Sequence, residues 1–353
     1  MHPARISAPL CAFLALALPA LANDGWGGLS ATGLTFGQTS AIAMEEEDLF
    51  ISPDRITVDY TFRNLTQQDV TGEVIFPLPP IGVWSMLESM WNLPEDPTRD
   101  NLVNFSATVD GQPVAVQIDR IAVIEPEWQE GRPLNEQYDT PGRDVTADLT
   151  RFGLPLTLDY QTVSAALLAL SPADQAAAKA AGIAEYYEGD PAQGVPPEGY
   201  PLWSIVYRYH WTQTFPAGAT LRVHHEYENR PSGGLFYFSN PPEDYQDYLV
   251  DQYCIDQGTA KAIVKALERP DGEEFGNYGT ALNISYVLRT ANSWAGPIGK
   301  FRLTLDKGQA ENVISLCADG VKKTGPTTFV IEKTNYTPER DLEILVVQPL
   351  TDQ

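Results

Sequence analysis

Alternation of apolar and polar side chains over residues 55–64 constrains the fold of this chain more than any other feature. Every second residue is large and apolar, namely Ile56, Val58, Tyr60 and Phe62, and the residues between them are polar or charged. Successive side chains of a β-strand point to opposite faces, so the pattern predicts a strand with one buried face. A second strand is expected over 70–76, where a run of prolines ends it.

A tight hairpin is expected farther along the chain. Asp110-Gly111 lies between two strand-like segments, 105–109 and 113–118. An Asp-Gly pair readily adopts the positive φ angles that a two-residue hairpin turn needs. Together these strands predict an N-terminal immunoglobulin-like β-sandwich lobe over 23–125.

The pattern changes to helix-forming sequence between 126 and 200. Ser171 is a typical N-cap residue, Pro172 suits the first helical position, and Asp174 supports the first turn. A helix is therefore expected from this point to about Ala181. A loop rich in proline and glycine follows over 189–201. We interpret 126–200 as a helical, Pro/Gly-rich insertion rather than an independent domain.

Strand-like sequence resumes in the last segment, 201–353, which we predict to be a C-terminal β domain. Strands are expected over 202–212, 220–228, 282–288, 301–305, 328–331 and 342–347, with a short helix over 259–267. The expected fold class is mainly β (α+β). It comprises an immunoglobulin-like β-sandwich lobe and a second β lobe, with a helical insertion.

The amino end has the three parts of a cleavable export signal. Arg5 supplies a positive start, residues 6–18 are apolar, and Ala20-Leu21-Ala22 suits a signal peptidase. Residues 1–22 are therefore predicted to be a signal peptide that is cleaved after Ala22, and Cys11 would leave with it. The remaining sequence holds no apolar run of about 18 residues, so no transmembrane segment is expected in the mature chain.

The charge balance limits the partners of the protein. The chain carries 47 acidic and 23 basic residues, a formal net charge of −24. Such a surface repels nucleic-acid phosphates and anionic membranes, which excludes DNA and RNA as partners. Calcium, cationic partners and neutral glycans stay open, and solubility alone is an alternative reason for the acidity.

Two cysteines remain in the mature chain, Cys254 and Cys317. An even count in an oxidising compartment predicts a disulfide. Closing a loop of this length would stabilise the fold by about 4 kcal/mol in the chain-entropy model. Two free thiols are the alternative.

One candidate metal site depends on how two strands pair around Pro216. If Thr214 paired with Thr220, His210 would lie opposite His224, with Glu226 nearby on the same face. These three side chains could then bind a divalent metal. The alternative is a polar outer face with an ion pair worth under about 1 kcal/mol. A register shift of one residue would remove the histidine pair.

Other signals for chemistry are sparse. The sequence has no Gly-x-Ser-x-Gly elbow, no phosphate-binding loop and no zinc-protease motif, so no catalytic residue is assigned. Trp294 lies in a turn-rich segment, where a large aromatic side chain could contact a ligand. The alternative is that Trp294 folds back to close the end of the sandwich.

Several segments resemble a bacterial exported family, domain of unknown function 4424. They are LFISPD at 49–54, YTFRN at 60–64, FPLP at 76–79, TANSWAGPIG at 290–299, LDKG at 305–308 and GVKKTGPT at 320–327. The resemblance covers nearly the whole mature chain and implies a Gram-negative periplasmic or secreted location. It supplies no catalytic residue.

These observations favour a binding or envelope-structural module that is exported to the periplasm or secreted, with an envelope protein, a glycan or a small molecule as its partner. Whether the chain is an enzyme stays open, although the missing motifs argue against it. One alternative is a hydrolase of the cell envelope, either metal-assisted through His210, His224 and Glu226 or based on carboxylates. Another is a glycan-binding protein that uses Trp294.

Overall fold

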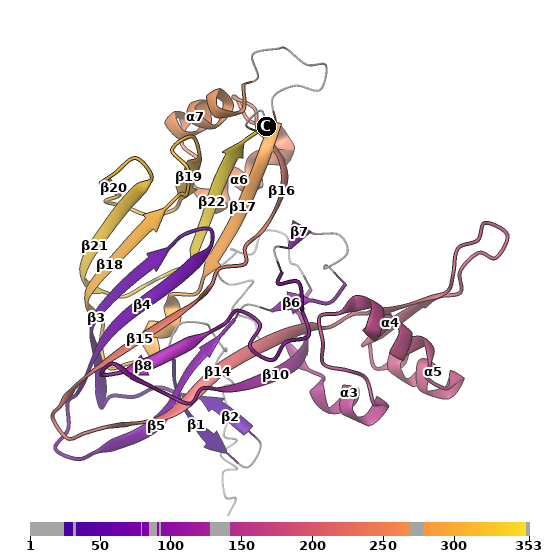
Figure 1. The fold of residues 1–353 in the computed structure, drawn as a ribbon, viewed down its shortest axis with the longest axis horizontal. Helices are drawn as coiled ribbons and strands as arrows, with labels where there is room; N and C mark the ends of the chain where they lie inside the picture. Colours follow the sequence, from indigo (N-terminus) through magenta and orange to yellow (C-terminus); the bar gives the residue numbers. More distant parts are fainter. Residues whose placement is uncertain are drawn as a thin grey trace, which may run out of the picture.

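The computed structural model describes residues 25–30, 33–78, 80–84, 90–91, 93–127, 142–268 and 278–350. The predicted signal peptide, with Ala22 and Cys11, lies outside these residues. Strands are the commonest element of the described chain, and three large sheets hold most of them (Figure 1). The mainly β class that the sequence predicts is therefore confirmed.

The largest sheet has eight strands in the order β20-β21-β18-β3-β4-β15-β8-β9. Strand β18 runs parallel to β3, and the other neighbours are antiparallel. Their bounds are β3 (Ile42–Ile51), β4 (Arg55–Asn64), β8 (Ser106–Val109), β9 (Gln112–Pro113), β15 (Thr220–Glu228), β18 (Ile298–Asp306), β20 (Lys322–Lys323) and β21 (Thr328–Tyr336).

A second sheet has seven strands and faces the first. Its order is β11-β10-β14-β5-β1-β2, and β6 also pairs with β14. Their bounds are β1 (Gly25–Ser30), β2 (Gly33–Phe36), β5 (Val70–Pro77), β6 (Ile81–Gly82), β10 (Gln117–Ile124), β11 (Arg143–Asp144) and β14 (Ser204–Phe215).

The core between these two sheets is rich in aromatic side chains. The apolar positions of β4 are buried, whereas the polar positions between them are partly or fully exposed, as the alternation predicts. From the opposite sheet, β14 contributes Tyr207, Tyr209 and Trp211, each 2% exposed or less. One continuous apolar core therefore joins the two sheets.

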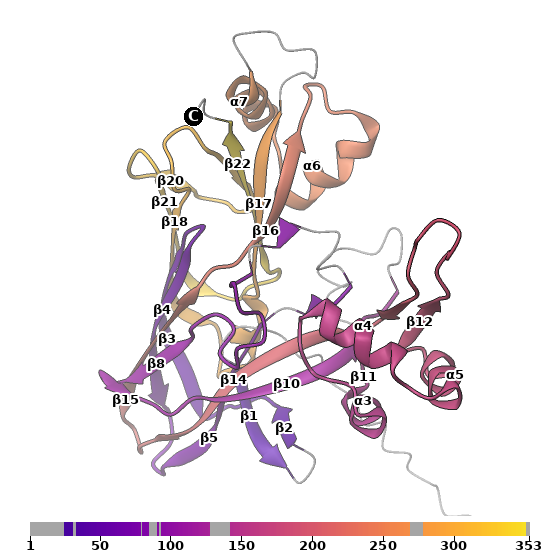
Figure 2. The same ribbon diagram turned by 45° about the vertical axis from the view of Figure 1, so that its right-hand side comes forward.

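A third sheet, β19-β22-β17-β16-β7, carries two helices on one face (Figure 2). Its strands are β7 (Met90–Trp91), β16 (Ser232–Tyr237), β17 (Tyr278–Tyr286), β19 (Val313–Leu316) and β22 (Leu342–Pro349). The short helix η1 (Asp244–Gln246) leads into α6 (Asp247–Tyr253), and α7 (Gln257–Leu267) follows. A second apolar core fills the space between this sheet and the helices.

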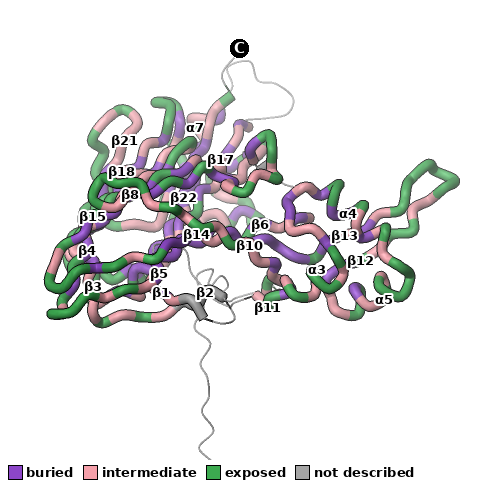
Figure 3. Tube along the Cα trace, turned by 60° about the horizontal axis from the view of Figure 1, so that its bottom comes forward, coloured by how far each residue is buried: buried purple, intermediate pink, exposed green. Residues whose placement is uncertain are grey.

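The predicted helical insertion contains three helices, α3 (Thr146–Phe152), α4 (Tyr160–Leu168) and α5 (Pro172–Ala180). It also contains the small hairpin β12 (Ala184–Tyr187) and β13 (Glu198–Pro201), whose connecting loop is mostly exposed (Figure 3). The Ser171 hydroxyl accepts a hydrogen bond from the backbone N–H of Asp174, so the predicted helix start is confirmed. Among the described helices, none is long and apolar enough to span a bilayer.

Strands from both ends of the chain alternate within the same sheets. Strands β3 and β4 lie between β18 and β15, and β5 pairs with β14. The strands of 23–125 therefore do not form a sandwich by themselves, and residues 125 and 201 are not boundaries between sheets. The sequence pattern shows which face of a strand is buried, but it does not show which strand lies beside it.

The pairing that the candidate metal site requires is wrong. Strands β14 and β15 are consecutive, but they belong to different sheets, and the turn at 216–219 crosses between them. Thr214 pairs with Thr71, and Thr220 pairs with Arg63. The physical reason is that each strand has an apolar face that must be buried. A crossing turn lets these two faces meet across the core.

Candidate functional site

His210 occupies a buried polar cluster on the outer face of β14. Its Nδ1 lies 2.9 Å from Oε2 of Glu73, and its Nε2 lies 3.6 Å from Oδ2 of Asp119. The Thr212 hydroxyl donates to the other carboxylate oxygen of Glu73. His210 and Glu73 are each 2% exposed, so their polar atoms need these partners. The cluster ties β14 to β5 and β10.

His224 and Glu226 lie elsewhere, on the outer face of β15. The Nδ1 atom of His224 is 2.9 Å from Oδ1 of Asp59 on β4, and the imidazole is partly exposed. Because the outer faces of the two sheets point in opposite directions, the apolar core separates this imidazole from His210. The predicted trio of His210, His224 and Glu226 is therefore not brought together. The described residues contain no group of three ligating side chains suited to a metal ion.

Trp294 is 3% exposed and packs in the sandwich core. Its ring centroid lies 4.5 Å from that of Phe62 and 5.7 Å from that of Trp26, and Phe215 completes the cluster. A side chain buried to this degree does not reach a ligand in solvent. The predicted ligand contact through Trp294 is therefore wrong, and Trp294 instead closes the end of the sandwich.

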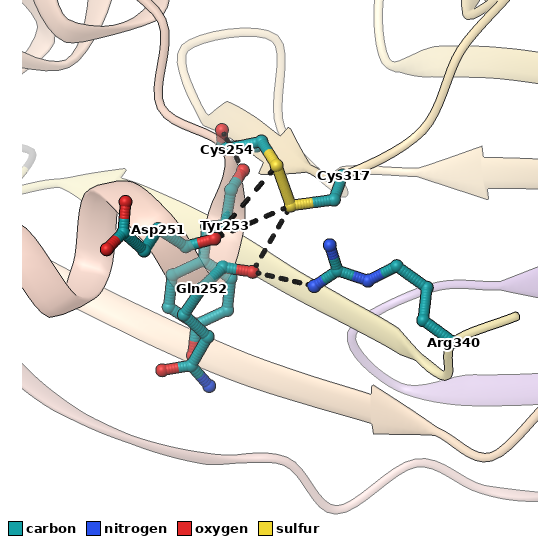
Figure 4. The surroundings of a disulfide bond; sticks show 7 residues. Asp251, Gln252, Tyr253, Cys254, Cys317 and Arg340 are labelled. Carbon is teal, nitrogen blue, oxygen red and sulfur yellow. Dashed lines mark hydrogen bonds between the residues drawn. A yellow bond between two sulfur atoms is a disulfide. The ribbon is translucent and has the colours of Figure 1, made fainter. Parts of the chain in front are cut away.

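The predicted disulfide between Cys254 and Cys317 is confirmed. Cys254 follows α6 in the left-handed conformation with φ of 50°, which turns the chain away from the helix. The Cys317 sulfur lies 3.5 Å from the carbonyl oxygen of Gln252 and 3.7 Å from that of Asp251 (Figure 4). The bond therefore fastens the end of α6 to the end of β19.

A pocket of about 600 Å³ opens beside this disulfide. Its size falls within the usual range of small-molecule sites. Residues of β19, β21 and the start of α7 form its walls, and the disulfide forms one edge. The lining residues are Cys254, Asp256, Thr259, Ile314, Ser315, Leu316, Cys317, Ala318, Asp319, Val321, Phe329 and Arg340.

The pocket is lined by positively charged, negatively charged and apolar side chains. Among the described residues that line it, Arg340 is the only cation, and its Nη2 lies 3.5 Å from the carbonyl oxygen of Gln252. Since a guanidinium has five N–H donors, this contact engages only part of its capacity. Asp256 is the N-cap of α7, and the backbone N–H of Thr259 donates to it and lowers the pKa of its carboxyl. Asp319 contributes a second carboxylate.

A titratable carboxyl lies close to Arg340. Glu343 of β22 accepts a hydrogen bond of 2.7 Å from the Ser285 hydroxyl. Burial raises the pKa of Glu343 to about 7, and the hydrogen bonds from Ser285 and Gln252 oppose this shift only in part. This carboxyl therefore changes its protonation near neutral pH, close to the charge of Arg340.

Sequence reasoning identified the cysteines of this pocket but missed the pocket itself. Arg340 and Phe329 lie far from Cys254 along the chain, and no local motif marks either residue. The cysteine pair was the usable signal, because a predicted disulfide shows that the ends of α6 and β19 must meet. Nothing in the pattern shows that β21 lies beside them.

The fold and this site define a β-sandwich protein with a disulfide-edged pocket. The family model named domain of unknown function (DUF4424) matches residues 22–345, and the chain belongs to this family. The match confirms the resemblance seen in the sequence segments.

No curated protein matches the chain. Among solved structures, it is similar to a candidate nutrient binding protein from Legionella pneumophila subsp. pneumophila str. Philadelphia 1, with 16% identity and a TM-score of 0.41. That similarity covers 92% of this chain and 72% of the other. A likeness this distant carries no argument about function.

Proposed function

We propose that the mature chain is a binding module of the Gram-negative cell envelope that holds a small zwitterionic molecule in the pocket beside Cys254–Cys317. The observation that carries the proposal is the pocket, where Arg340 and two carboxylates meet an apolar wall. A free amino acid or a short peptide carries both charges and an apolar side chain. The pocket matches each of these three features.

The chemistry of the walls favours such a ligand. Arg340 can bind a carboxylate through two parallel N–H donors, a geometry that a guanidinium favours. Asp256 can accept from an ammonium group, and the hydrogen bond from the Thr259 backbone N–H lowers the pKa of its carboxyl, which further favours the ionised form. Phe329 and Leu316 offer apolar surface to a side chain.

The disulfide supports binding by holding the pocket in shape. It joins two segments separated by 63 residues, and both segments contribute to the walls. A pocket that is already formed loses little conformational freedom when the ligand enters, which favours affinity. Binding should therefore weaken when the disulfide is reduced.

A thermal-shift measurement tests the pocket. The mature protein is heated with each of the free amino acids and a set of dipeptides, with Arg340→Ala and Phe329→Ala measured in parallel. Arg302→Ala is a matched control, because Arg302 is an exposed arginine on β18 whose guanidinium lies 4.0 Å from Asp48. A compound that stabilises the wild type and Arg302→Ala but neither pocket variant supports the proposal. Equal stabilisation of all four proteins, or none with any compound, contradicts it.

The envelope location has its own support and its own test. The leader pattern of 1–22, the disulfide and the exported family resemblance all favour secretion. Mass spectrometry of the protein from a periplasmic extract should give a chain that begins at Asn23. A chain that retains Met1 and is recovered with the cytoplasm would refute export.

A further inference from the structure

A group of exposed large side chains that do not line the pocket lies on β16 and the helical segment after it. The exposed fractions of these side chains are 75% for Leu235, 44% for Tyr237, 60% for Tyr245 and 63% for Tyr248. Large side chains of this kind are normally scattered singly on a surface. Here four of them fall within fourteen consecutive residues. We name these four residues the tyrosine face.

The members of the tyrosine face lie close together. Leu235 and Tyr237 are two residues apart on β16, so they share one side of the strand. The Tyr237 hydroxyl donates to Glu243 at 3.3 Å, just before η1. Tyr245 lies in η1, two residues after Glu243, which is the N-cap of that helix. Tyr248 follows Tyr245 three residues later, near the start of α6, a spacing that brings helical side chains onto one face.

A buried glutamine holds this surface in one conformation. Gln246 is fully buried, and its side-chain oxygen accepts from the backbone N–H groups of Ser239 and Glu243 and from the Ser239 hydroxyl. Its side-chain N–H donates to the carbonyl of Tyr237 at 3.0 Å. These bonds fasten η1 to β16, so the exposed rings are presented on a rigid segment. A rigid aromatic surface loses little conformational freedom on binding.

The charge around the tyrosine face determines which partner fits. The same segment exposes four carboxylates, those of Glu243, Asp244, Asp247 and Asp251. Residues 231–258 contain no lysine, arginine or histidine. The flat side of a tyrosine ring attracts cations through the ring quadrupole, and arginine is the commonest cationic partner. Carboxylates beside the rings attract the same cations and repel acidic partners.

We propose that the tyrosine face is a docking site for an arginine- and lysine-rich segment of a partner protein. Guanidinium groups stack on Tyr245 and Tyr248, and the carboxylates of Glu243 and Asp247 lie within the same segment to pair with them. This surface is separate from the pocket, so the inference goes beyond the proposed function and does not depend on it.

Fluorescence anisotropy with a labelled (Arg-Ser)5 peptide at physiological salt tests the proposal. The double variant Tyr245→Ala/Tyr248→Ala keeps the net charge and should weaken binding about tenfold, since each exposed cation–π contact contributes about 0.5–1 kcal/mol. Tyr245→Phe/Tyr248→Phe keeps both rings and should bind like the wild type. Far-UV circular dichroism and thermal melting confirm that each variant is folded.

Two controls separate a specific site from the general acidity of the protein. Glu188→Gln/Glu226→Gln removes two exposed acids, one in the β12–β13 loop and one on β15, and should leave binding within about twofold of the wild type, because exposed charges far from the site are largely screened. A labelled (Glu-Ser)5 peptide should not bind. Unchanged peptide binding by Tyr245→Ala/Tyr248→Ala would overturn the proposal. An equal loss of binding in that variant and in the double glutamine control would also overturn it. Competition by a neutral oligosaccharide such as chitohexaose, or dimerisation that needs the two tyrosines, would overturn it in favour of a glycan or a second copy.

Discussion

A buried histidine should make this fold sensitive to mild acid. His225 is fully buried on the inner face of β15, and its ring lies 4.9 Å from that of Phe76 and 5.2 Å from that of Phe105, measured between centroids. Tyr60 and Tyr227 complete the aromatic enclosure. Burial lowers the pKa of His225 to about 3, and the charge of His224 adds to this shift. The imidazole therefore stays neutral while the protein is folded.

The sign and size of the effect follow from proton linkage. In the unfolded chain a histidine has a pKa of about 6.5, so below that pH the unfolded state binds a proton that the native state excludes. Stability is therefore lost as the pH falls from about 6.5 towards 3. Between pH 7 and pH 5 the loss amounts to about 2 kcal/mol, since each unit of pH difference corresponds to about 1.4 kcal/mol.

Urea unfolding of the wild type and of His225→Phe at pH 7 and pH 5 measures this loss. The phenylalanine fills nearly the same space without a titrating nitrogen, so the stability difference between the two proteins should shift by about 2 kcal/mol in favour of the variant at pH 5. Tyr227→Phe is the matched control, because it alters the same cluster without a group that titrates in this range. The reasoning is refuted if His225→Phe and the wild type lose the same stability between the two pH values.

Three further predictions concern the disulfide, Glu343 and Trp294. Replacing both Cys254 and Cys317 with serine should lower the free energy of unfolding by about 4 kcal/mol, because the disulfide closes a loop of 63 residues. Reduction of the wild type should cause the same loss in urea unfolding. An unchanged urea midpoint would contradict this prediction. For Glu343 the folded pKa of about 7 exceeds the ordinary glutamate value of 4.5, so its contribution to stability is present below pH 4.5 and is lost as the pH rises through 7. The stability of the wild type relative to Glu343→Gln should therefore fall over that range in pH-dependent unfolding, and a constant difference would rule the shift out. Trp294→Ala should destabilise the core by about 3–5 kcal/mol in thermal or urea unfolding, and a loss below about 1 kcal/mol would mean that the ring is not buried.

Local patterns predicted the parts of the fold that depend on neighbouring residues. The alternation over 55–64 identified the buried face of β4, and Ser171 identified the start of α5, because burial of one face and helix capping are decided within a few residues. The cysteine count predicted the disulfide for a similar reason. Outside the predicted signal peptide the sequence has two cysteines, so only one pairing was available.

Pairing between distant strands could not be predicted in this way. The turn after Phe215 has the composition of a hairpin, yet it carries the chain from one sheet to the other. His210 therefore meets Glu73, which lies 137 residues away, instead of His224. An alternating strand accepts any partner that presents a matching apolar face, and the sequence around 216–219 does not show which of the candidates is chosen.

A crystal structure of the mature protein with the compound that stabilises it most tests the central claim most directly. We predict that the compound lies in the pocket beside the disulfide, with its carboxylate on the Arg340 guanidinium and its apolar part against Phe329. Electron density for the compound at another surface, with the Arg340 side chain untouched, would contradict this account of the protein as a pocket-based binding module.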